Sequence, residues 1–358
     1  MNNLTVLIDG GFLLMKCSSV LQDGFAIANS QAQKDRTAKE FKDLLARTII
    51  KTLHQFPADN VILMSEGGSW RKKLPVPKQL EDITYKGHRE RKVEIDWDAI
   101  YTAYNEFEQT FASYGLTRSQ NIMIEGDDWA WWWSRRLNAE GTNVLIWTVD
   151  KDLQQLVQWH NNVFTAWYND RAGLILPEEL ECETDDIAEF MLNSPPGNQV
   201  LDKLISTQHQ PIKYINPEMI VVEKVLCGDS GDNIMSVVRL EKNGRTYRFS
   251  EKLCKELCNE LNINSIQEML DKRKQIAKYI VSLPKFIEGN FDENDVVEMI
   301  VYNTRLVWLH ERTLPDTVTK LMVQEEYKIA DIQPLKTNHK LILDQDKSIE
   351  DTFYSMFD

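Results

Sequence analysis

NIMIEGDDWAWWWSRRLNAEGTNVLIWTVDKDLQQLV, residues 121–157, is the stretch that decides the fold. It begins with a short apolar run, 122–124, continues with an amphipathic stretch of helical spacing, and ends with a second apolar run, 143–149. We expect two buried strands joined by a helix, because a βαβ unit has this order and buried parallel strands read as unbroken apolar runs. In open sheets of this kind, ligands bind beyond the carboxyl ends of the strands.

Both expected strands are followed by carboxylates. Glu125, Asp127 and Asp128 follow the first strand, and Asp150 and Asp152 follow the second. Asp150 and Asp152 point the same way while the chain stays extended, since side chains alternate along a strand. Acids gathered at one edge repel one another unless cations lie between them, and hard oxygen ligands favour Mg²⁺ or Mn²⁺. The alternative is a set of solvated loop acids in an acidic protein, but two clusters in one βαβ unit favour the metal site.

Two earlier apolar runs end in acids in the same manner. Residues 4–8 run into Asp9, and residues 61–64 are followed by Glu66. Both runs have the length and composition of buried strands. Four strands that each end in carboxylates form the strongest signal in the sequence.

Composition limits the class of protein. The chain has 358 residues, 42% of them hydrophobic and 27% charged, which is ordinary for a soluble globular protein with room for two domains. Its net charge of −14 excludes a generally basic surface but not a local basic patch. Five cysteines without a CxxC pair fit a reducing compartment. The first residues do not resemble a signal peptide and no apolar run reaches transmembrane length, so we expect a cytoplasmic protein that does not bind membranes.

We expect two domains. Residues 1–190 are predicted to form an α/β domain with a mostly parallel central sheet, covered by helices over 35–56 and 96–114. The polar segment 170–215 reads as the passage into a helical domain over 191–358. Apolar spacing predicts the helices of that domain at 217–226, 264–282, 295–309 and 315–323.

Residues 70–95 differ in charge from the rest of the chain. They include eight basic residues, Arg71, Lys72, Lys73, Lys78, Lys86, Arg89, Arg91 and Lys92. Their cations could neutralise phosphates, and Trp70 and Tyr85 could stack on bases. The alternative is a solvated loop, but beside a carboxylate cluster we favour a phosphate-binding arch.

Two further features concern the interior and the second half of the chain. Trp129, Trp132 and Trp133 share about one helical face, which favours core packing over a stacking platform. Asp229 and Asp232 lie three residues apart, hence on one side if a helical turn forms there. Lys242 and Arg245 belong to a small basic loop that follows.

The motifs, taken in order, resemble those of the 5′-nuclease superfamily of flap endonucleases and 5′→3′ exonucleases, and most of all the RNase H of tailed bacteriophages. The matching motifs span residues 4–234 and are LIDGG, Glu66 followed by YKGHRERK, EGDD, TVDKDLQQL and CGDSGDNI. The resemblance implies a PIN-like nuclease domain and a helix–hairpin–helix-like element at about 217–250 that holds duplex DNA. Two departures are Glu66, where the family usually has Asp, and residues 235–239, which replace a glycine-rich turn.

The resemblance also implies a site with two Mg²⁺ ions, for which Mn²⁺ can substitute. The first ion would be held by Asp9, Glu66, Glu125, Asp127 and Asp150, and the second by Asp152 and Asp229, with Asp128 and Asp232 as outer ligands. Two such ions clamp the attacking and leaving oxygens of an in-line displacement. Asp150, Asp152, Lys86 and Arg89 would carry the chemistry, the last two at the scissile phosphate. The expected nucleic-acid contacts are Arg71, Lys72, Lys73, Tyr85, Lys86, Arg89, Arg91, Lys92, Lys242 and Arg245.

The activity implied is that of a 5′→3′ exonuclease and flap endonuclease with RNase H activity. Its substrates would be RNA/DNA hybrids, 5′ flaps and nicked duplexes, and its task the removal of RNA primers and adjacent DNA during phage DNA replication. We expect a monomer with a single-strand-binding protein as a partner. The tail TFYSMFD, residues 352–358, resembles the peptides with which phage replication proteins bind the sliding clamp, although a helical turn docked on its own domain is the simpler interpretation.

Two other functions share part of this pattern. A PIN-like single-strand ribonuclease shares the acid-edged sheet, but the CGDSGDNI segment and the long helical half speak against it. A DNA-binding replication or repair factor without catalysis is disfavoured, because a pure binder gains nothing from anionic clusters that face phosphates.

Overall fold

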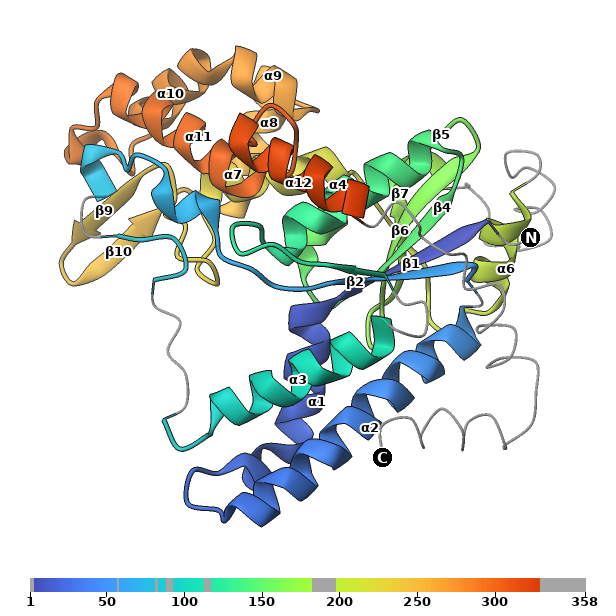
Figure 1. The fold of residues 1–358 in the computed structure, drawn as a ribbon. Helices are drawn as coiled ribbons and strands as arrows, with labels where there is room; N and C mark the ends of the chain where they lie inside the picture. Colours follow the sequence, from blue (N-terminus) through green and yellow to red (C-terminus); the bar gives the residue numbers. More distant parts are fainter. Residues whose placement is uncertain are drawn as a thin grey trace. The chain divides into compact units, whose positions relative to one another are not determined.

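The structure is a computed structural model that describes residues 3–56, 58–80, 83–87, 93–112, 117–181 and 198–328. By compactness the chain divides into two units (Figure 1). The first unit contains Met1–Gly68, Arg91–Ile215 and Lys320–Asp358, and the second contains Ser69–Glu90 and Asn216–Thr319. Each unit is described below by itself.

The first unit is built on one mixed, mostly parallel sheet. Its strands are β1 (Leu4–Asp9), β2 (Asn60–Met64), β3 (Thr117–Ser119), β4 (Asn143–Trp147), β5 (Gln158–His160), β6 (Val163–Asn169), β7 (Gly173–Pro177) and β8 (Lys213–Ile215). The order is β3-β2-β1-β4-β6-β7-β8, with β5 paired to β6. β6 is antiparallel to β5 and β7, whereas the other neighbours are parallel. The expected fold class is therefore confirmed.

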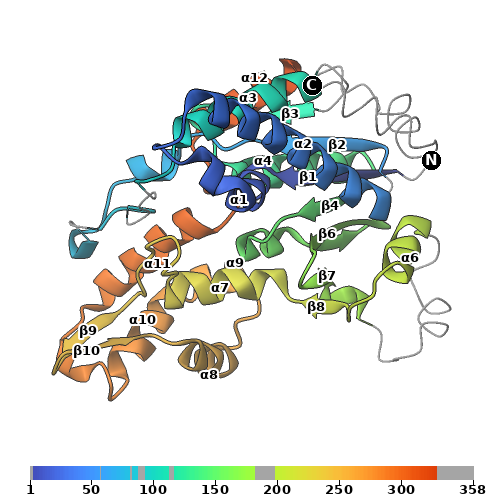
Figure 2. The same cartoon turned by 90° about the horizontal axis from the view of Figure 1, so that it is seen from below.

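Helices cover both faces of the sheet. They are α1 (Gly10–Leu21), α2 (Gln31–Gln55), α3 (Trp97–Ala112), α4 (Gly126–Ala139) and α6 (Gln199–Ser206), with short 3₁₀ helices at η1 (Gln22–Phe25), η4 (Lys151–Leu156) and η5 (Glu178–Leu180). In Figures 1 and 2, α1, α2 and α3 lie on one face of the sheet and α4 lies on the other. This layering explains why β1 and β4 are apolar at nearly every position, because strands covered on both faces have no solvated side.

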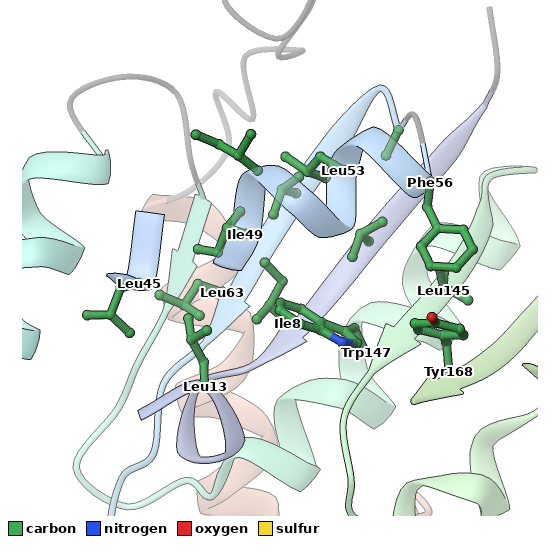
Figure 3. Packing of buried hydrophobic residues seen from close by; sticks show 14 of the residues in the cluster. Ile8, Leu13, Leu45, Ile49, Leu53, Phe56, Leu63, Leu145, Trp147 and Tyr168 are labelled. Carbon is green, nitrogen blue, oxygen red and sulfur yellow. The ribbon is translucent and has the colours of Figure 1, made fainter. Parts of the chain in front are cut away.

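The core beneath α1 and α2 is shown in Figure 3. Ile8 of β1 and Trp147 of β4 are fully buried there beside Ile49 of α2. Phe56, which follows α2, packs edge-on against Tyr168 of β6, with ring centroids 4.5 Å apart. The apolar stripe of α2 therefore fixes the helix against strands from both halves of the sheet.

The strand expected at 122–124 is wrong. Residues 121–124 form a turn in which Met123 N–H donates to Asn121 Oδ1 at 3.0 Å, and Ile122 is 84% exposed. The strand is instead β3, which lies at the sheet edge and is separated from β4 by β2 and β1. The helix α4 therefore connects two strands that are not neighbours, so the simple βαβ unit is also wrong.

The segment 170–215, expected as a passage between domains, contributes to the sheet. It contains β7 and β8, which pair in parallel from Ile175–Lys213 to Pro177–Ile215. The sheet thus extends to residue 215. Its residues 182–197 lie outside the described part of the chain.

The second unit is mostly helical. Its elements are η2 (Trp70–Lys73), η3 (Lys78–Leu80), α7 (Pro217–Cys227), β9 (Arg239–Lys242), β10 (Arg245–Arg248), α8 (Glu251–Leu261), α9 (Ile266–Asp271), α10 (Arg273–Ser282), η6 (Ile287–Gly289) and α11 (Glu293–Val307). Helix α12 (Asp316–Lys328) runs across the boundary of the two units in the sequence. Buried Asn303 of α11 donates to the carbonyls of Val225 and Met235, both at 2.8 Å, and so ties α7 to the loop that follows it.

The tryptophans of α4 pack in the interior, as their spacing predicts. Trp129 and Trp133 are 0% and 1% exposed, and the Trp133 indole donates to Ser119 Oγ at 2.6 Å. Trp131, on which the prediction was silent, is buried as well, and Trp132 is half-buried. No helix among the described residues has the length and apolar character needed to cross a membrane.

Asp96 offers a test of how α3 is anchored. Its carboxylate accepts from Ala99 N–H at 3.0 Å in the first turn of α3 and from Lys34 of α2 at 2.6 Å, and these bonds hold the pKa of Asp96 below its ordinary value. We expect Asp96→Ala to lower the free energy of unfolding by about 1 kcal/mol at pH 7. Because the pKa is lowered by folding, the ionic part of this contribution is present above the unfolded pKa of about 3.9 and is lost as the pH falls through the folded value.

The measurement is chemical denaturation of both proteins between pH 7 and pH 2.5. Asp98→Ala, which removes an exposed acid from the same turn, is the control and should change stability less. A gap between wild type and Asp96→Ala that stays constant down to pH 2.5 would show that the ion pair contributes nothing.

Candidate metal and nucleic-acid sites

The register of the sheet brings three predicted acids to one edge. Asp9 pairs with Met64, and Ile8 pairs with Trp147, so the parallel strands β2, β1 and β4 end side by side. Asp9 is the last residue of β1, while Glu66 and Asp150 follow the ends of β2 and β4. The carboxyl ends of parallel strands are where α/β sheets bind ligands.

A chain of hydrogen bonds connects Asp9 with the acids after β4. The Asp9 carboxylate, 8% exposed, accepts from Phe12 N–H at 2.9 Å and from the Thr148 hydroxyl at 2.5 Å. Thr148 Oγ1 in turn accepts from Asp150 N–H at 2.9 Å, and Asp150 Oδ1 accepts from Asp152 N–H at 2.8 Å. The three aspartates are therefore oriented by one continuous network.

Glu66 lies beside the first turn of α1. A Cβ atom on Gly11 would be 3.1 Å from Glu66 Oε1 and 3.4 Å from Asp9 Oδ1, so the two carboxylates converge on the space that this glycine leaves open. The second Glu66 oxygen accepts from Gly126 N–H at 3.4 Å, at the start of α4. Asp9 caps α1 and Glu66 approaches the first turn of α4, and the positive ends of the two helix dipoles stabilise both anions.

Glu125, Asp127 and Asp128 belong to the beginning of α4 and do not follow a strand. Glu125 is the N-cap residue, and the other two lie in the first turn of the helix. Glu125 and Asp128 are buried, with 4% and 1% exposed, whereas Asp127 is half-buried. A helix N-terminus favours such anions electrostatically.

The donor set has the chemistry that Mg²⁺ or Mn²⁺ prefers, since it consists of carboxylate oxygens. Over the residues that the structure describes, no group of three or more His, Cys, Asp or Glu side chains is assembled to hold a metal ion. The observations that fit an ion are the convergence of Asp9 and Glu66 and the hydrogen-bonded orientation of Asp9 and Asp150.

Asp229 belongs to the second unit and forms an ion pair there. Lys224 Nζ lies 2.6 Å from Asp229 Oδ2, and Gly231 N–H donates to Asp229 Oδ1 at 2.7 Å. Burial opposes ionisation of this carboxyl, but Lys224 and the backbone donors outweigh burial and hold its pKa below the ordinary value. Asp229 is thus a carboxylate at neutral pH.

Asp232 contacts the segment expected to be the arch. Its carboxylate accepts from the Tyr85 hydroxyl at 3.2 Å and lies 3.7 Å from Lys86 Nζ. Lys86 N–H donates to Asp232 O at 2.8 Å, and Lys86 has a left-handed backbone with φ 55°. The Asn233 side chain adds a hydrogen bond to Thr84 O at 2.9 Å.

Residues 229–234 form a loop closed by the paired backbones of Asp229 and Ile234. The helical turn that would put both aspartates on one side is therefore absent from this part of the described chain.

The expected nucleic-acid contacts differ in their surroundings. Arg71 is 3% exposed and donates to Leu306 O at 3.0 Å, so it serves the interior of the second unit and its placement speaks against a phosphate contact. Lys72 and Lys73 are exposed, as are Lys242, which pairs with Glu288, and Arg245 on β10. Arg89, Arg91, Lys92 and the tail 352–358 lie outside the described residues.

Thr148 was missed in the sequence, although it links Asp9 to Asp150. A hydroxyl residue two positions before Asp150, directly after a buried strand, was the available signal. The element expected to hold a duplex, at about 217–250, consists of α7, the loop after it and the β9–β10 hairpin.

Comparisons by sequence and by structure relate this chain to known proteins. No protein-family model matches the sequence, and no curated protein matches it. Among solved structures, the T5 D15 protein co-crystallised with metal ions is similar at a TM-score of 0.56 and 16% identity over 92% of this chain and 99% of that chain. The T5 5′-exonuclease with bound zinc ions is similar at a TM-score of 0.50 and 17% identity over 95% and 98% of the two chains. At sequence identities this low, structural similarity concerns the fold alone. By this similarity, the chain has the 5′-nuclease fold.

Proposed function

We propose that the protein is a divalent-metal-dependent 5′-nuclease, a phosphodiesterase that acts at the 5′ ends and flaps of nucleic acids. The observation that carries the proposal is the placement of Asp9, Glu66 and Asp150 at or just after the carboxyl ends of three adjacent parallel strands. The fold shared with the T5 5′-exonuclease supports the same conclusion. We further propose RNase H activity, with RNA primers and adjacent DNA as the natural substrate.

The first unit would hold the ions. The residues proposed for this task are Asp9, Glu66, Glu125, Asp127, Asp128, Asp150 and Asp152. When bound, two Mg²⁺ ions supply a nucleophilic hydroxide and stabilise the leaving oxygen. The protein contributes the orientation of the ligands, since Phe12 N–H and Thr148 fix both oxygens of Asp9.

A binding protein without catalysis fits these observations less well. Asp9, Glu125 and Asp128 are buried carboxylates, and an anionic edge repels a phosphate backbone in the absence of cations. Cation binding removes this repulsion and gives the acids a role. A non-catalytic factor would gain nothing from burying them.

The second unit supplies candidates for phosphate binding. Lys72, Lys73 and Arg245 are exposed, and we propose that they neutralise the nucleic-acid backbone. Lys86 is proposed to stabilise the negative charge that develops on the phosphate during displacement. In the structure Asp232 accompanies Lys86, so a phosphate would compete with this carboxylate for the ammonium group.

The decisive experiment is cleavage of a 5′-labelled RNA–DNA/DNA duplex and of a matching 5′ flap, with Mg²⁺ and with EDTA. We expect short 5′ products with Mg²⁺ only, and a loss of more than about a hundredfold in rate for Asp150→Asn because a ligand charge is removed. Duplex binding by Asp150→Asn, measured by fluorescence anisotropy, should persist.

Asp59→Asn is the matched control. Asp59 lies just before β2, at the amino-terminal ends of the strands, where it accepts from Asn3 N–H at 2.7 Å. This variant should cleave like wild type. Binding of the duplex without cleavage in Mg²⁺ or Mn²⁺ would favour the non-catalytic factor. Cleavage restricted to single-stranded RNA would favour the PIN-like ribonuclease.

Lys86→Ala tests the phosphate contact. We expect the single-turnover rate to fall about a hundredfold while the Kd for the duplex changes by less than about threefold, since the charge is needed mainly in the transition state. Lys274→Ala, which removes an exposed lysine of α10 in the same unit, should leave the rate unchanged. Equal rates for Lys86→Ala and wild type would remove Lys86 from the mechanism.

A further inference from the structure

Glu108 is a buried acid that the proposed site does not use. It lies on α3 and is 1% exposed, on the helix face that also carries buried Ile100, Tyr104 and Phe107. Burial raises the pKa of Glu108, although Ser65, Arg118 and Tyr104 act in the opposite direction. An acid kept in such surroundings needs partners, and the identity of those partners points to its role.

Its first partners lie beside Glu66. Arg118 of β3 forms an ion pair with Glu108, with 2.6 Å between Nη2 and Oε2, and the Ser65 hydroxyl donates to the other carboxylate oxygen. Arg118 Nε also donates to Ser65 Oγ at 3.3 Å, and Ser65 N–H donates to Ser119 O at 2.9 Å. Ser65 directly precedes Glu66, so these bonds fix the backbone from which Glu66 projects.

Tyr104, which shares the buried face of α3 with Glu108, lies beside Asp9. The Tyr104 hydroxyl donates to Gly10 O at 3.1 Å. The fit is close, because a Cβ atom on Gly10 would be 3.0 Å from Tyr104 Oη and 2.6 Å from Met64 O. Burial, together with the charges of Glu108 and Asp9, raises the pKa of Tyr104 well above its ordinary value, so its hydroxyl remains a donor.

We infer that Glu108, Arg118 and Tyr104 are positioning residues, which hold the Asp9–Gly10 and Ser65–Glu66 backbones so that both carboxylates converge for divalent-ion binding. The inference rests on the proposed metal site and adds a part of the protein that touches neither ion nor nucleic acid. Glu108 with Arg118 holds the backbone beside Glu66, and Tyr104 of the same helix face holds the backbone beside Asp9 on the adjacent strand. Hydrogen-bonded groups behind metal ligands set ligand orientation, and their loss weakens metal affinity by about ten- to a hundredfold.

The test is Mn²⁺ binding to the purified full chain, measured by isothermal titration calorimetry without nucleic acid, with the Tm of the metal-free protein recorded for each variant. Tyr104→Phe removes one hydroxyl and keeps the ring, and Glu108→Gln keeps the shape and removes the charge. We expect each variant to bind Mn²⁺ about tenfold more weakly than wild type.

Asn198→Ala is the control for a purely structural effect. Asn198 is buried at the amino-terminal end of β4, far from the carboxyl ends of the strands. There it donates to Asn143 Oδ1 at 2.8 Å, and its side chain caps α6 by accepting from Leu201 N–H. It should lower the Tm and leave Mn²⁺ affinity as in wild type. If Tyr104→Phe and Glu108→Gln fold and bind Mn²⁺ like wild type, or if affinity falls equally in Asn198→Ala, the inference is overturned. A wild-type protein that binds no Mn²⁺ would instead overturn the proposed metal site and this inference with it.

Discussion

The parallel pairing of β1 with β2 and β4 is the constraint on which the rest of the structure depends. Its register sets Asp9 beside Met64 and Ile8 beside Trp147, and thereby decides which residues emerge together at the carboxyl edge. A shift of one residue in either pair would turn Asp9 away from the neighbouring acids, because side chains alternate along a strand. Full burial on both faces makes such a shift costly, since every apolar residue of β1 is in the core.

The acids at this edge are held in place by hydrogen bonds from backbone amides and from the Thr148 hydroxyl. Asp9 is bound by Phe12 N–H and Thr148, and Glu66 is approached by Gly126 N–H. The first turns of α1 and α4 thus present amide groups to these carboxylates. The same arrangement that stabilises the anions fixes their directions.

The sequence predicts the central strands well, and the reasons for its failures are physical. Runs such as 4–8 and 143–149 are recognisable because a strand covered on both faces has to be apolar throughout. β3 could not be recognised in this manner, because Thr117, Arg118 and Ser119 are polar. They form a strand by pairing with β2, residues 62–64, which is distant in the sequence. The run 122–124 has the composition of a strand, but Asn121 closes a turn there.

In the candidate site, too, features set by the local sequence could be predicted, and features set by contacts between distant segments could not. The positions of Asp9, Glu66 and Asp150 could be predicted, because a strand end is a property of the local sequence. The role of Thr148 and the contact of Tyr85 with Asp232 depend on which segments meet after folding. Local composition alone predicted a phosphate contact for Arg71, because the segment around it is basic. In the structure Arg71 is buried and donates to Leu306 O.

The central place of β1 has a consequence for the order in which the protein can fold during synthesis. β1 is made before both of its neighbours, and β2 can pair with it once residues 60–64 are available. Its other edge has no partner until β4, residues 143–147, has left the ribosome. A nascent chain therefore carries an apolar strand with one open edge through the synthesis of about eighty further residues, at roughly 5–20 residues per second. Such an edge pairs readily with other chains, so this interval is when the protein is most exposed to aggregation and most dependent on chaperones.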